Sequence, residues 1–111
     1  MVSQAIRERY LRDPLPIRLG GLAADLARVA SFAKNPLNRE AVASLLEEGK
    51  YFAEWAAPDA SLPLQEMLAQ VQTALAVWQR RWVAGQPEPA MQQTAQQWSD
   101  QLLALSGLVS G

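Results

Sequence analysis

The sequence of 111 residues contains no cysteine and no histidine. These absences exclude disulfide bonds, thiolate nucleophiles, the usual zinc sites and histidine-based acid–base catalysis. No apolar run approaches the ~20 residues that a membrane-spanning helix needs, and the N-terminus lacks the pattern of a signal peptide. We therefore expect a cytoplasmic protein whose remaining candidates for chemistry are carboxylates, serine, lysine and tyrosine.

Carboxylate chemistry needs acidic side chains on the inner, facing sides of packed helices. The helical pattern predicts none in such a position, because Glu40, Glu47 and Glu54 recur well away from the apolar stripe of their own helix. Gly20-Gly21 lacks the lysine and the spacing of a phosphate-binding loop. The sequence therefore predicts a protein that is not an enzyme and that has no catalytic residue, metal or cofactor.

The charges are unevenly distributed, although the net charge is only −1. Residues 1–39 carry seven basic and three acidic side chains (+4), and residues 40–111 carry three basic and eight acidic ones (−5). The two blocks either neutralise one another or suit a partner. We expect no nucleic acid partner, because the net charge is slightly negative and no recognition-helix motif is present. We expect no membrane partner, because the basic segment lacks a broad apolar face. The excess of arginine over lysine favours a bacterial source.

Proline and glycine divide the chain into segments that repeat apolar residues at steps of three and four. The predicted helices cover about residues 15–34, 38–57, 62–84 and 89–108, after a basic arm over residues 1–14. Asp13, Asn38 (or Asn35) and Ser61 are the predicted N-caps of the first three helices. Four amphipathic helices with short connections predict an all-α, single-domain, antiparallel up-down-up-down four-helix bundle, with a short helical or extended N-terminal arm.

Three of the four tryptophans, Trp78, Trp82 and Trp98, lie on the apolar stripes of the last two predicted helices. We expect them to pack in the core, where each indole N–H needs a hydrogen-bond acceptor. The alternative is that Trp78 and Trp98 line an apolar pocket for a small molecule.

A stripe of small residues lies beside the leucine stripe of the first predicted helix. Its members are Gly20, Ala24, Ala27 and Ser31. Because glycine within a helix costs ~1 kcal/mol relative to alanine, a close approach by another backbone is expected there. The approaching backbone belongs either to a neighbouring helix of the bundle, to residues 3–12, or to a second subunit. In the last case the stripe is a dimer surface.

The outer face of the second predicted helix carries two large aromatic residues among acidic ones. We name it the aromatic–acidic face and define it as Tyr51, Trp55, Glu47, Glu48 and Glu54. Aromatic anchors flanked by acidic groups are typical of a surface that binds a basic protein segment. That segment belongs to a partner, to a second copy, or to the chain's own N-terminus, which contains Ile6, Arg7, Tyr10, Leu11 and Arg12.

The sequence thus predicts a small, non-enzymatic helical adaptor, regulatory or assembly module that acts by protein–protein contact, with a homodimer as one form. The alternative is a small-molecule-binding helical bundle with an apolar pocket near Trp78 and Trp98.

Overall fold

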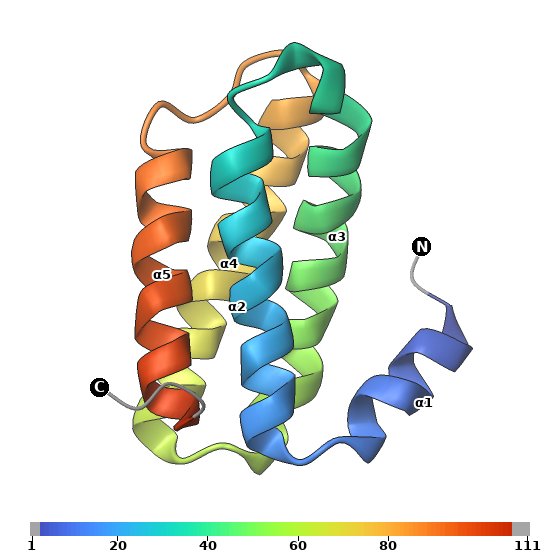
Figure 1. The fold of residues 1–111 in the computed structure, drawn as a ribbon, viewed down its shortest axis with the longest axis vertical. Helices are drawn as coiled ribbons and strands as arrows, with labels where there is room; N and C mark the ends of the chain where they lie inside the picture. Colours follow the sequence, from blue (N-terminus) through green and yellow to red (C-terminus); the bar gives the residue numbers. More distant parts are fainter. Residues whose placement is uncertain (1–2, 108–111) are drawn as a thin grey trace.

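Five α-helices and no strand make up residues 3–107, the part of the chain that the computed structural model describes. They are α1 (Gln4–Arg12), α2 (Leu15–Phe32), α3 (Arg39–Ala56), α4 (Leu62–Val83) and α5 (Met91–Ser106), with single 3-10 turns at Pro36–Asn38 (η1) and Ala57–Asp59 (η2). Figure 1 shows α2 to α5 side by side along the long axis, with α1 set off near the beginning of α2. The all-α prediction is confirmed, and the helix packing is consistent with a helical bundle. Within residues 3–107, every helix is too short or too polar to cross a lipid bilayer.

The break between α1 and α2 determines where the N-terminal arm lies. Asp13 was expected to cap the helix that follows it, but this prediction is wrong: Asp13 ends α1, and Pro14 occupies the N-cap position of α2 without a side-chain cap. A residue before proline avoids helical backbone angles, and Asp13 is extended, with ψ 147°. The arm is therefore a separate short helix that leaves the axis of α2 (Figure 1).

The other helix ends follow the predicted signals with local differences. Asn35 rather than Asn38 makes the capping bond, because its Oδ1 accepts a hydrogen bond of 3.0 Å from the N–H of Leu37. Ser61 precedes α4 without a side-chain capping bond. Gly85 takes the left-handed conformation expected after the third predicted helix, with φ 76°. The fourth predicted helix is shorter than expected, since α5 spans Met91–Ser106, and residue 108 lies outside the described residues.

The apolar stripes of the long helices meet in one core. Its fully buried large side chains include Leu19, Leu22, Leu26, Leu46, Leu68, Leu75, Met91 and Leu102. Each such leucine contributes on the order of 2 kcal/mol through the apolar area that it removes from water. The apolar repeat of the last predicted helix includes Leu105 and predicts that it is buried, but this prediction is wrong, because the side chain is 60% exposed.

α2 is the central helix of this arrangement and packs closely against both α3 and α5. Ser99 of α5 is buried and its Oγ donates a 2.7 Å hydrogen bond to the carbonyl oxygen of Ala23. On the other side, Gly49 of α3 is buried against α2, and a Cβ atom at this position would lie 3.6 Å from Cδ1 of Leu22. The tighter contact is with α4, where the added atom would lie 3.1 Å from Cδ1 of Leu75. The absence of a side chain at Gly49 therefore makes room for Leu75, while α2 lies at an ordinary contact distance.

Candidate functional site

The short helix α1 is held against α2 and α3 by one aromatic side chain. Tyr10 is the buried residue of α1, and its ring stacks on that of Phe52 of α3 with centroids 4.0 Å apart and planes 7° apart. Its hydroxyl donates a 2.9 Å hydrogen bond to the carbonyl oxygen of Arg18 on α2. Tyr10 therefore anchors the arm to both helices, because it combines a large apolar ring with a satisfied polar end.

The two aromatic residues of the aromatic–acidic face are partly covered by their own chain. Trp55 lies 6.0 Å from Tyr10 and 5.6 Å from Tyr51, measured between ring centroids. The guanidinium carbon of Arg7 lies 6.0 Å from the Trp55 ring, and Nζ of Lys50 lies 5.1 Å from the Tyr51 ring. Both aromatic side chains are accordingly half-buried. The chain's own basic arm thus contacts Trp55, which is one of the three alternatives that the sequence left open for the basic segment on this face.

The three glutamates of the face lie in different surroundings. Glu54 is exposed beside α1, whereas Glu47 is half-buried and has an interaction partner. Glu48 is half-buried and faces Asp25 of α2, with which it forms a side-chain hydrogen bond. The structure therefore brings Trp55 and Glu54 near the arm, leaves Tyr51 beside Trp55 and Lys50, and directs Glu48 toward the helix interface.

Asp25 is a carboxyl group in the interface between α2 and α3, and its side chain is 3% exposed. Its pKa is raised to about 8, mainly by burial and also by the charge and the hydrogen bond of Glu48, while Arg28 partly opposes the shift. Nη1 of Arg28 lies 3.5 Å from Oδ1 of Asp25, while Oδ2 is buried and receives no hydrogen bond from residues 3–107. The prediction that no acidic side chain faces inward is therefore wrong. A protonated Asp25 can donate to Glu48, which explains how this pair is accommodated.

Arg18 is the second buried charge of α2, and it ties together three segments. Its Nη2 lies 2.9 Å from Oδ2 of Asp59 in η2, and its Nε donates a 3.0 Å hydrogen bond to the carbonyl oxygen of Asp13. Nη1 is buried without a partner from the described residues. Burial raises the pKa of Tyr10 above its usual value, Arg18 lowers it and Asp25 raises it, so the three groups act on one another electrostatically.

These groups surround a groove of about 380 Å³ between α1, α2 and α3, which we name the junction groove. Its apolar wall is formed by Ile6, Tyr10, Ile17, Gly21 and Phe52, and its charged groups are Arg9, Asp13 and Glu48. A second groove, of about 500 Å³, lies on the other side of α1 between Arg7, Trp55 and Asp59. Grooves on both sides of α1 mean that the arm covers the α3 face incompletely.

Sequence reasoning missed Arg18 and Asp25, although a signal for both was present. They are seven residues apart and therefore share one side of a helix, next to Leu22 and Leu26. Charged residues at the edge of an apolar stripe are usually exposed to solvent. The pattern alone therefore could not distinguish these two buried residues from ordinary surface charges.

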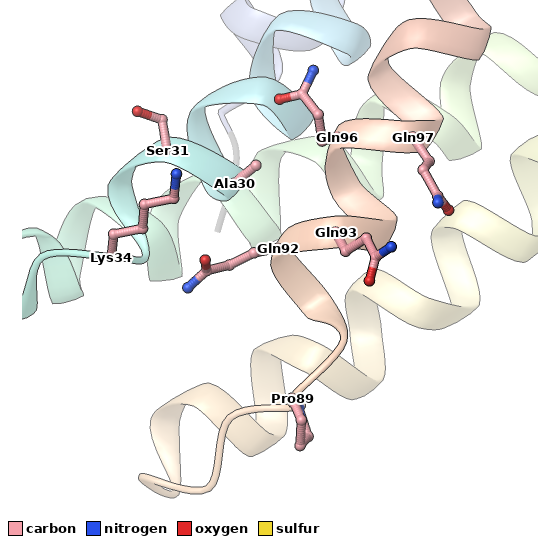
Figure 2. Close-up of a pocket in the computed structure, with 8 residues that line it drawn as sticks. All are labelled: Ala30, Ser31, Lys34, Pro89, Gln92, Gln93, Gln96 and Gln97. Atoms are coloured by element: carbon pink, nitrogen blue, oxygen red, sulfur yellow. The ribbon is translucent and has the colours of Figure 1, made fainter.

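The small-residue stripe lies on the part of α2 that is not directed at the core. Gly20, Ala24 and Ala27 are half-buried and Ser31 is exposed. Figure 2 shows Ser31 of α2 and Lys34, which follows this helix, on one side of a groove of about 550 Å³, opposite glutamine side chains of α5. These glutamines are Gln92, Gln93, Gln96 and Gln97. The role of the stripe as a dimer surface stays a prediction.

The tryptophans of α4 and α5 pack against one another. Trp78 is 6% exposed and stacks on Trp98 with centroids 5.5 Å apart, and Trp98 is itself half-buried. Trp82 is half-buried, and its Nε1 donates a 2.9 Å hydrogen bond to the carbonyl oxygen of Arg39. Neither Trp78 nor Trp98 lines one of the four grooves described for residues 3–107. The stacked rings occupy the space that a ligand between them would need.

Comparison with models of protein families, with curated proteins and with solved structures finds no match for this chain. The function is therefore inferred from the α1–α3 contact and from the groups around it.

Proposed function

We propose that this chain is a small helical module that acts by protein–protein contact, without catalysis, as an adaptor, regulator or assembly subunit. The contact uses the aromatic–acidic face of α3. One observation carries the proposal: a basic helix of the chain itself, α1, docks on this face through Tyr10 and Arg7, each of which lies 6.0 Å from the Trp55 ring. The face thus accepts a helix that supplies an aromatic anchor and arginine side chains, a combination typical of energetically important interface residues.

The incomplete coverage of this face supports contact with a further segment. Grooves flank α1 on both sides, and the apolar side chains of Leu11 and Ile17, at their edges, are 39% and 45% exposed. Exposed apolar groups beside half-buried aromatic rings favour association more than an evenly charged surface does. The exposed carboxylate of Glu54 and the nearby Asp59 give the surface a negative charge that favours a basic partner.

A second copy of the chain is the partner that we propose first. Residues 7–18 contain four arginines, so the same segment that docks within the chain can dock on a neighbouring subunit in an isologous dimer. The stripe of Gly20, Ala24, Ala27 and Ser31 is the alternative dimer surface. The module in this proposal is an antiparallel up-down-up-down four-helix bundle, and it works in a bacterial cytoplasm.

Sedimentation equilibrium at high micromolar concentration tests this function. The native chain is expected to form a dimer that weakens as salt rises, because its charges lie at an exposed rim. The double variant Tyr51→Ser with Trp55→Ser, shown to be folded by circular dichroism, is expected to be a monomer. Val77→Ser with Val83→Ser is the matched control, since these exposed side chains of α4 are apolar but lie elsewhere. If the Tyr51/Trp55 variant keeps the native association and every partner captured by the native chain, the proposal is wrong.

A further inference from the structure

Within residues 3–107, the carboxyl pair of Asp25 and Glu48 forms no ion pair with a buried cation. Arg28 contacts Oδ1 of Asp25 at 3.5 Å, and its side chain is 56% exposed. The other oxygen, Oδ2, is buried and receives no hydrogen bond from a donor among the described residues. An acceptor atom left in this state costs free energy, which either a shared proton or a bound cation can recover.

The junction groove gives a ligand access to this pair through Glu48. The carboxylate of Glu48 lies in the groove wall and is hydrogen-bonded to Asp25 behind it. The rings of Tyr10 and Phe52 and the side chain of Ile17 form apolar walls, and Asp13 adds a second carboxylate. A volume of about 380 Å³ lies within the range of small-molecule sites. Aromatic and aliphatic walls with carboxylates favour a ligand that has a positive end on a short apolar chain.

We propose that the junction groove binds a small organic cation, an alkylammonium or alkylguanidinium group, at the Asp25–Glu48 carboxyl pair. The charged end donates hydrogen bonds to Glu48 and neutralises the pair, and the alkyl chain lies along Tyr10 and Phe52. Arg9 at the groove is a like charge that opposes the ligand. Of the aromatic–acidic face, this binding uses only Glu48, together with Asp25, and it requires neither Tyr51 nor Trp55.

Binding is linked to proton release, because the cation favours the ionised pair. The charged and titratable groups around Asp25 are Arg18 and Arg28 of α2, Glu48 of α3, and Arg9 and Tyr10 of α1. With the pKa of Asp25 raised to about 8, the fraction of ionised Asp25 rises steeply between pH 7 and pH 9. The dissociation constant should therefore fall roughly ten-fold over this range.

Titration by two-dimensional NMR with n-butylammonium and n-butylguanidinium at fixed ionic strength tests the site. We expect saturable shifts of the Gly21 and Glu48 amide signals, with a dissociation constant in the millimolar range. Uncharged n-butanol at the same concentrations is the ligand control and should leave these signals unchanged. Saturation by n-butanol with the same affinity, or the absence of saturable shifts with both cations, would overturn the proposal.

Four variants distinguish specific binding of the cation in the junction groove from its general attraction to acidic side chains on the surface. Glu48→Gln should weaken binding at least ten-fold, and Asp25→Asn should abolish the dependence on pH. Glu54→Gln, on the same helix but facing the other groove, is the matched control and should bind like the native chain. Arg9→Gln should strengthen binding roughly two- to five-fold by removing a like charge. Native affinity in Glu48→Gln, or equal losses in Glu48→Gln and Glu54→Gln, would show that no specific site exists.

Discussion

Asp25 of α2 and Glu48 of α3 form a carboxyl pair between their two helices. The residue after Glu48 is Gly49, and a Cβ atom there would lie 4.0 Å from the Cβ atom of Asp25. Burying such a polar pair seldom adds net stability, because both groups lose contact with water. The cost of burying this pair therefore depends on its protonation.

Stability should fall as pH rises, because of Asp25. Its pKa in the folded protein, about 8, lies above its ordinary value of 3.8, so the folded state holds more protons between these values. Each pH unit in this window contributes up to about 1.4 kcal/mol. Urea denaturation should show a loss of at most about 4 kcal/mol in the free energy of unfolding from pH 5 to pH 8.5.

The variant Asp25→Asn, which cannot ionise, is the control for this effect. Its free energy of unfolding should be nearly constant between pH 5 and pH 8.5 and should exceed that of the native chain at the upper end. A native chain whose stability does not change over this range would show that Asp25 is ionised in the folded state.

Tyr10 should control the attachment of α1. Tyr10→Phe removes only the hydrogen bond to the Arg18 carbonyl and should cost about 1 kcal/mol. Tyr10→Ala also removes the stacking on Phe52 and should cost about 2–4 kcal/mol. Limited trypsin digestion after Arg9 and Arg12 should be much faster in Tyr10→Ala than in the control Leu11→Ala. Equal digestion rates would mean that Tyr10 does not hold the arm.

The stacked tryptophans should differ in their contribution to stability. Trp78 is almost completely buried and Trp98 is half-buried, so Trp78→Ala should cost about 3–5 kcal/mol and Trp98→Ala less. Acrylamide quenching of single-tryptophan variants should find Trp78 the least accessible of the four rings. If Trp98 proves less accessible than Trp78, the packing of α5 on α4 differs from that described here.

Apolar repeats predicted the long helices well, because their buried positions follow from periodicity alone. Leu22 and Leu26 are examples, since each lies on a stripe that continues over four or five turns. The surroundings of Asp25 and Glu48 could not be predicted in this way. Each lies at the edge of a stripe, and its burial depends on the distance between α2 and α3, which a single-helix pattern does not contain. The position of α1 was similarly unpredictable, because it depends on the angles at Asp13 and Pro14.

Two glycines that look alike in the sequence should respond in opposite ways to substitution by alanine. Both lie within helices, where alanine is favoured over glycine by up to ~1 kcal/mol. At Gly21 an added Cβ atom would lie 3.9 Å from Cε1 of Tyr10, which is an ordinary contact, so Gly21→Ala should be stabilising by up to that amount. At Gly49 the added atom would lie 3.1 Å from Cδ1 of Leu75 and 3.6 Å from Cδ1 of Leu22. Both leucines are completely buried and have little room to move, so the clash should exceed the gain in helix propensity.

Gly49→Ala should accordingly lower the free energy of unfolding by about 1–2 kcal/mol. Urea denaturation of both variants at pH 6 measures the difference, and circular dichroism shows whether the helical content is kept. The pH is chosen so that Asp25, beside Gly49, stays protonated in the folded state. A stabilised Gly49→Ala variant would show that Leu75 can move aside and that α3 and α4 do not require a residue without a side chain at this position.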